Sequence, residues 1–179
     1  MKVPFIDFSF DLEGNEDEYS NLLLRHIRNG EFIGGNAVKE FEEKLSKYLK
    51  TENVVTVGNG TDALIIALES LELKKKEVIV PAFSFFATSE AVVQAGLTPK
   101  FVDVSVDDCN IDTNQIEKNI TENTGAILPV HLFGKSCEMS DILSIADNYN
   151  LKIIEDTAQS FGTQTNEKYL GTIGYAGCF

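Results

Sequence analysis

From Asn53 onward, short apolar runs alternate with amphipathic segments, and this alternation constrains the fold more than any other feature of the chain. The runs, at 54–57, 78–80, 101–104, 126–130 and 151–154, are typical of strands buried on both faces. Helices are predicted between them at 61–71, 84–95, 113–120 and 139–149. The pattern predicts an α/β fold of three layers, α/β/α, in which the central layer is a mostly parallel sheet. Ligands of such sheets bind beyond the carboxyl ends of the strands.

The first 50 residues have a different pattern, typical of two amphipathic helices. One apolar face is formed by Tyr19, Leu22, Leu23 and Ile27, and a second by Val38, Phe41, Leu45, Tyr48 and Leu49. We therefore expect residues 1–50 to form a helical segment that packs on the core, and residues 51–179 to form the α/β domain.

The charge balance limits the partners of the chain. Its 15 Lys and Arg against 28 Asp and Glu give a net charge of −13, which argues against nucleic acid and anionic membranes as partners. A single anionic ligand remains possible, because helix amides can bind it. The three cysteines are distant from one another and no apolar run approaches the ~20 residues of a membrane span, so we expect a cytoplasmic protein with free thiols.

Two of the predicted strand ends allow two interpretations each. The first predicted strand is followed by Gly58, Gly60 and Thr61, and then by a helix. In one interpretation Thr61 caps the helix and the free amides of its first turn bind an anion. In the other, the segment is an ordinary tight turn. After the second strand, Phe83, Phe85 and Phe86 are more typical of core than of a surface on which an aromatic ligand stacks.

Glu155 and Asp156 close the fifth predicted strand and are its most informative residues. A carboxylate at the end of a buried strand is costly without a partner. The protonated ring nitrogen of a pyridine cofactor is one such partner, and a capping role with access to solvent is the alternative. His131 follows the fourth strand and His26 is the only other histidine, which argues against a histidine-based metal site.

Five sequence blocks occur in an order that resembles a known family. They are GTDAL at 60–64, VIVPAFSFFAT at 78–88, FVDV at 101–104, PVHLFG at 129–134 and IEDTAQ at 154–159. Together with Val3-Pro4-Phe5, they resemble the DegT/DnrJ/EryC1/StrS sugar aminotransferases, which have the fold of type I pyridoxal-phosphate enzymes. The resemblance implies pyridoxal 5′-phosphate as cofactor, amino transfer from glutamate to the keto-sugar of a nucleoside diphosphate sugar, a role in amino-sugar and surface polysaccharide biosynthesis, and a homodimer.

The resemblance also implies roles for six residues. Gly60, Thr61 and the amide of Asp62 match the phosphate-binding turn. Phe85 matches the aromatic residue that stacks on the pyridine ring. Asp156 matches the acid that pairs with the ring nitrogen, and Gln159 matches the amide that contacts the ring face or its hydroxyl.

Two departures from the family pattern limit what the chain is expected to do. Tyr175 stands where an aspartate usually follows Gly174. The family's Schiff-base lysine matches no residue of this chain, since Lys152 and Lys168 lie elsewhere in the pattern. We therefore expect an inactive amino-terminal fragment that lacks the carboxy-terminal part. The alternatives are a sugar dehydratase of the same family, a non-catalytic remnant, and a nicotinamide-binding domain, which requires a glycine where Ala63 stands.

Overall fold

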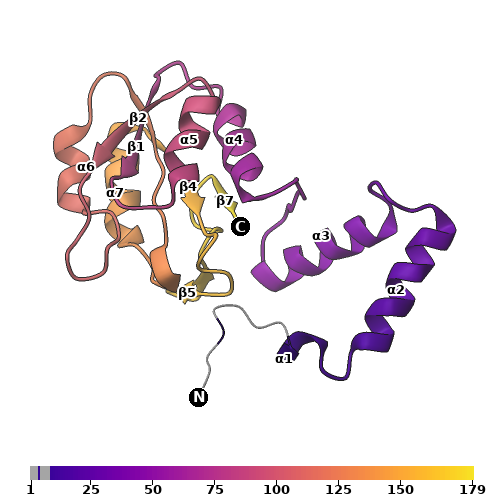
Figure 1. The fold of residues 1–179 in the computed structure, drawn as a ribbon. Coiled ribbons are helices and arrows are strands. Elements are labelled where there is room, and N and C mark those ends of the chain that lie inside the picture. The colour runs from indigo at the N-terminus through magenta and orange to yellow at the C-terminus, as the bar shows by residue number, and fades with distance from the viewer. Residues whose placement is uncertain (1–3, 5–8) are drawn as a thin grey trace. The chain divides into compact units, whose positions relative to one another are not determined.

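The computed structural model describes Pro4 and residues 9–179, and the side chains of Phe10 and Asp11 are not described (Figure 1). Val3 and Phe5 of the family-like opening lie outside the described residues. The chain divides into two compact units, Met1–Leu45 and Ser46–Phe179. The first unit holds α1 (Ser9–Leu12), α2 (Glu16–Asn29) and most of α3 (Asn36–Leu49). The two predicted helices are therefore confirmed, whereas their packing on the core stays a prediction.

The second unit is built on a five-stranded sheet in which every pairing is parallel. Its order is β2 (Thr98–Val102), β1 (Glu77–Pro81), β3 (Thr124–Ile127), β4 (Lys152–Asp156) and β7 (Ala176–Cys178). A short antiparallel hairpin, β5 (Gln164–Thr165) with β6 (Lys168–Tyr169), lies between β4 and β7 in the chain. The predicted α/β fold with a parallel sheet is confirmed.

Helices cover both faces of the sheet, as Figure 1 shows. One face is packed by α4 (Gly60–Ser70) and α5 (Phe86–Gln94), and the other by α6 (Thr113–Asn119) and α7 (Met139–Tyr149). Successive residues of β1 alternate between the two cores: Val78 and Val80 face α4 and α5, and Ile79 faces α6 and α7. This two-sided burial explains why the strands are apolar at consecutive positions.

Residues 54–57 are not a strand, and this prediction was wrong. The side chain of Val55 is 78% exposed, and within the described residues no strand pairs with the segment. A run of valines fits a strand only where a neighbour offers backbone hydrogen bonds, and β2 and β7 are the edge strands of this sheet. The third predicted strand also shifts: β2 begins at Thr98 and ends at Val102.

Among the residues that the structure describes, no helix has both the length and the apolar character that crossing a bilayer requires.

Candidate active site

A pocket of about 210 Å³ lies beyond the carboxyl ends of β1 and β4, where the sheet topology predicts a ligand site. Five of the six residues singled out from the sequence line it: Gly60, Thr61, Phe85, Asp156 and Gln159. Asp62, the sixth, is not among the lining residues. Ser84 and Cys178 also line the pocket, although no sequence pattern identified them as site residues.

Asp156 ends β4 and turns its carboxyl group into the pocket, although its side chain is only 6% exposed. Its Oδ1 accepts a hydrogen bond from the Ala158 amide at 3.2 Å, and its Oδ2 accepts one from Thr88 Oγ1 at 3.0 Å. Burial raises the pKa of Asp156, and these two donors offset that effect only in part. Within the described part of the chain, no Lys or Arg forms an ion pair with it. Asp156 is thus a buried acid to which the described residues supply no cationic partner.

The start of α4 forms one wall of the pocket. The helix is capped by Asn59 and not by Thr61, which corrects the prediction: Asn59 Oδ1 accepts from the Asp62 amide at 2.9 Å. Asn59 Nδ2 in turn donates to Asp62 Oδ2 at 2.9 Å, so the two side chains close the first turn. The Asp62 amide is therefore already bonded to the cap. The amides of Gly60 and Thr61 lie in the first turn, where the helix itself offers no carbonyl to accept from them.

Phe83, Phe85 and Phe86 are not core residues, and the interpretation favoured from the segment alone was wrong. All three side chains are more than half exposed, and Phe85, at the N-cap of α5, is 74% exposed. The segment between β1 and α5 lies beyond the carboxyl end of β1, where the helices that cover the strand no longer cover its side chains. One of these rings, Phe85, lines the pocket and offers it a flat apolar face.

Gln159 is held by a turn that follows β3. Its Oε1 accepts from the Phe133 amide at 2.8 Å, in the 3-10 turn Leu132–Gly134, where Phe133 has a left-handed backbone with φ of 54°. Buried Asn110 fixes that turn, because its Oδ1 accepts from the Leu132 amide and its Nδ2 donates to the Lys135 carbonyl. With its oxygen used in this way, the Gln159 amide group presents NH₂ donors.

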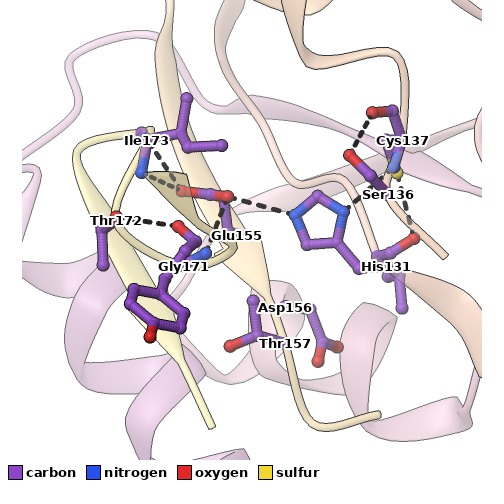
Figure 2. Close-up of polar contacts among 12 residues, drawn as sticks. His131, Ser136, Cys137, Glu155, Asp156, Thr157, Gly171, Thr172 and Ile173 are labelled. Carbon is purple, nitrogen blue, oxygen red and sulfur yellow. Dashed lines mark hydrogen bonds and ion pairs between the residues drawn. The ribbon is translucent and has the colours of Figure 1, made fainter. Parts of the chain in front are cut away.

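Glu155 points away from Asp156, as Figure 2 shows. Its side chain is fully buried. Its Oε1 accepts from the amides of Ile173 and Gly174, and its Oε2 accepts from the Gly171 amide at 2.9 Å and from His131 Nε2 at 3.1 Å. Burial alone would raise the pKa of Glu155, but these four donors outweigh it and lower the pKa.

His131 carries its ring proton on Nε2, because its Nδ1 accepts from the Cys137 amide at 3.1 Å. The imidazole is therefore a neutral donor to Glu155. The sequence placed His131 at a strand end without a role, and nothing in the sequence pattern identified its partner. The contact joins the ends of two neighbouring strands and becomes visible only in three dimensions.

Comparisons with a family profile, curated proteins and solved structures identify proteins that are similar to this chain. Residues 14–179 match the profile of the DegT/DnrJ/EryC1/StrS aminotransferase family. A dTDP-3-amino-3,6-dideoxy-alpha-D-galactopyranose transaminase of Aneurinibacillus thermoaerophilus is 37% identical over 99% of this chain and 49% of its own length. The solved structure of a DegT DnrJ EryC1 StrS aminotransferase from Brucella abortus matches with a TM-score of 0.92 and 36% identity, over 98% of this chain and 49% of that chain.

A dehydratase is also similar. The structure of a GDP-4-keto-6-deoxymannose-3-dehydratase with a trapped PLP-glutamate geminal diamine matches with a TM-score of 0.81 and 31% identity, over 87% of this chain and 42% of that chain. The chain spans about half the length of the curated relatives it matches.

Proposed function

The chain belongs to the DegT/DnrJ/EryC1/StrS aminotransferase family, and from this premise we propose that its pocket binds pyridoxal 5′-phosphate for the transfer of an amino group to the keto-sugar of a nucleoside diphosphate sugar. Glutamate is the proposed donor, and amino-sugar and surface polysaccharide biosynthesis is the proposed setting. The single observation that carries the proposal is Asp156, a buried acid that lines the pocket without a cationic partner in the described part of the chain.

Asp156 fits the ring nitrogen of the cofactor on physical grounds. Its pKa is raised by burial, so a cation beside it would stabilise the carboxylate that burial disfavours. A protonated pyridine nitrogen is such a cation, and Asp156 would hold the proton there. When bound, pyridoxal phosphate supplies an electron sink for the carbon next to the transferred nitrogen.

The start of α4 fits the phosphate. The amides of Gly60 and Thr61, the Thr61 hydroxyl and the positive end of the helix dipole would bind the dianion. The Asp62 amide, assigned to the phosphate by resemblance, already donates to Asn59 Oδ1, so we propose that Asp62 acts through the cap. Phe85 would stack on one ring face, and the Gln159 NH₂ would donate to the ring hydroxyl.

No lysine is among the described residues that line the pocket. Lys152 is exposed and lies over the Tyr175 ring, and Lys168 is exposed in β6. We therefore propose that the 179-residue chain holds the cofactor without a covalent bond and by itself aminates no sugar, because no lysine of its pocket can move the proton.

Assembly and location complete the proposal. The exposed rings of Phe85, Phe86 and Phe133 provide apolar surface suited to a subunit contact, which supports a homodimer. The cysteines Cys109, Cys137 and Cys178 are free, which supports a reducing compartment, the cytoplasm.

Binding of pyridoxamine phosphate tests the proposal directly, because this form lacks the aldehyde that reacts with surface lysines. We expect the 179-residue chain to bind it, and we expect Asp156→Asn to weaken binding about tenfold or more through loss of a charge-assisted hydrogen bond. Asp141→Asn, on an exposed residue of α7, is the control and should bind as the parent chain does. Equal affinity in the Asp156→Asn variant would show that the acid does not face the ring.

The similarity to a dehydratase favours one second candidate, removal of a sugar hydroxyl on the same cofactor. The pocket would hold the cofactor in the same way for both reactions. Mass spectrometry of a nucleotide keto-sugar after incubation with glutamate and the whole gene product separates them. An amino-sugar supports the transferase, and a keto-sugar that has lost a hydroxyl supports the dehydratase.

A further inference from the structure

Thr88 does not line the pocket, but it forms a hydrogen bond with Asp156, which does. Thr88 belongs to the first turn of α5, and its side chain is 2% exposed. Its Oγ1 is 3.0 Å from Asp156 Oδ2 and 2.8 Å from Ser84 Oγ, and Ser84 lines the pocket. A line of two hydroxyl groups therefore joins the pocket surface to the carboxyl group of Asp156.

The proton count fixes the direction of these bonds. A threonine hydroxyl has one proton, and Thr88 donates it to Asp156. Ser84 must then be the donor in its bond with Thr88, so the order is Ser84 to Thr88 to Asp156. A hydroxyl that itself accepts a hydrogen bond is a stronger donor, and Ser84 thereby strengthens the contact with the carboxylate.

Thr88 and the Ala158 amide together fix the plane of the carboxylate, because each holds one of its two oxygens. Both donors are neutral. They stabilise the anion without supplying a counter-charge, so the negative charge stays available to a cation in the pocket. A lysine in the place of Thr88 would instead form an ion pair with Asp156 and remove that attraction.

We infer that Thr88, supported by Ser84, is a positioning residue that keeps Asp156 ionised and turned toward the ring nitrogen of the bound cofactor. The inference rests on the proposed function and extends it to two residues that do not take part in the predicted cofactor contacts.

Other titratable groups stand near Asp156 but cannot replace Thr88. Glu155 points to the opposite face, His131 donates its one proton to Glu155, and burial raises the pKa of the Cys178 thiol to about 12. The remaining acids on the helices around the site are Asp62 and exposed Glu69 on α4, Glu90 on α5, and Asp141 and Asp147 on α7. Asp62 is bonded to Asn59, Glu90 accepts from Gln94, and the two α7 residues are exposed on the opposite face.

The test compares Thr88→Val, Thr88→Ser and Ser84→Ala in the 179-residue chain. Two probes are titrated from pH 5 to pH 9: pyridoxamine phosphate, and its deaza analogue, in which carbon replaces the ring nitrogen. Thr88→Val keeps the shape and removes the donor. We expect it to bind pyridoxamine phosphate about tenfold more weakly, and we expect the pH below which binding weakens to move upward.

Conservative replacement and the second probe separate positioning from damage to the fold. Thr88→Ser should bind within about twofold of the parent chain, because the donor is restored. Ser84→Ala should show a smaller loss in the same direction. All variants should bind the deaza analogue equally, since it has no ring nitrogen for Asp156. Thr124→Val, a buried threonine bonded to Glu77 away from the pocket, is the control and should match the parent chain with both probes.

The results separate the inference about Thr88 from the proposed binding of the cofactor. If Asp156→Asn weakens binding but Thr88→Val and Ser84→Ala keep the parent affinity and pH profile, the inference about Thr88 is wrong and the proposed function stands. Equal losses for both probes would assign Thr88 a structural role only. If Thr88→Val does not fold, Ser84→Ala decides alone. Failure of the parent chain to bind pyridoxamine phosphate would overturn the proposed function and this inference with it.

Discussion

Replacing Glu155 with glutamine tests the buried carboxylate that joins β4 to the segment before β7. Glu155 is 0% exposed, and its two oxygens accept four hydrogen bonds, three from backbone amides and one from His131. Glutamine has nearly the same shape but only one acceptor oxygen. If that oxygen faces Ile173 and Gly174, the NH₂ group faces the Gly171 amide and His131 Nε2, so donor meets donor.

The magnitude follows from the bonds that are lost. Two bonds to a charged acceptor disappear and two buried donors lose their partner, while relief of the buried charge offsets part of the loss. We expect the free energy of unfolding at pH 7 to fall by about 3 kcal/mol. The pKa of Glu155 is lowered in the folded chain, so its contribution to stability is present above the unfolded value of about 4.3 and is lost as pH falls toward the folded value.

Urea denaturation followed by circular dichroism at pH 7 and at pH 3.5 measures both effects. The difference between the parent chain and Glu155→Gln should be largest at pH 7 and should narrow at pH 3.5. Glu122→Gln, on an exposed residue, is the control and should change stability by less than about 0.5 kcal/mol. A variant as stable as the parent chain, or a difference that does not depend on pH, would refute the assignment of Glu155 as an ionised anchor.

Three further predictions concern other positions. Asp156→Asn should leave the unfolding free energy at pH 7 unchanged or raise it by up to about 1 kcal/mol, because burial raises the pKa of this acid and its anion costs stability; urea denaturation without cofactor measures this, and a clear loss would contradict it. Asn59→Ala should cost about 1 kcal/mol by freeing the Asp62 amide, whereas Asn59→Ser should retain the cap, as thermal unfolding would show. Burial raises the pKa of both Cys137 and Cys178 to about 12, so iodoacetamide at pH 8 should label them in urea but not in the native chain; rapid native labelling, detected by mass spectrometry, would disprove it.

Elements that depend only on their own apolar pattern were predicted correctly from the sequence. Predictions were wrong where the structure of a segment depends on contacts with residues distant in the chain. The predicted helix at 139–149 coincides with α7, since its apolar spacing alone defines it. Residues 54–57 have an equally clear apolar pattern, but a strand also requires a paired neighbour. The cap of α4 was misassigned because Asn59 and Thr61 are both good capping residues, and only the backbone geometry selects Asn59.

The candidate site shows the same division. Five of the six predicted residues line one pocket, because the blocks that contain them follow strands or begin helices that meet at one edge of the sheet. Thr88 was missed because its contact with Asp156 spans 68 positions of the chain. Ser84 was missed because it bonds to Thr88 and reaches Asp156 only through it. The exposure of Phe85 was also missed, since an apolar residue near a buried strand gives no sign of where the burial ends.

The two adjacent acids of β4 differ because a strand turns successive side chains to opposite faces. Glu155 enters the face where the chain supplies four donors, and its pKa is lowered. Asp156 enters the pocket, where the chain supplies two neutral donors, and its pKa is raised. Had both pointed the same way, two like charges would have competed for one set of partners. The alternation therefore leaves one acid with four donors within the fold, and it leaves the other without a cation among the described residues.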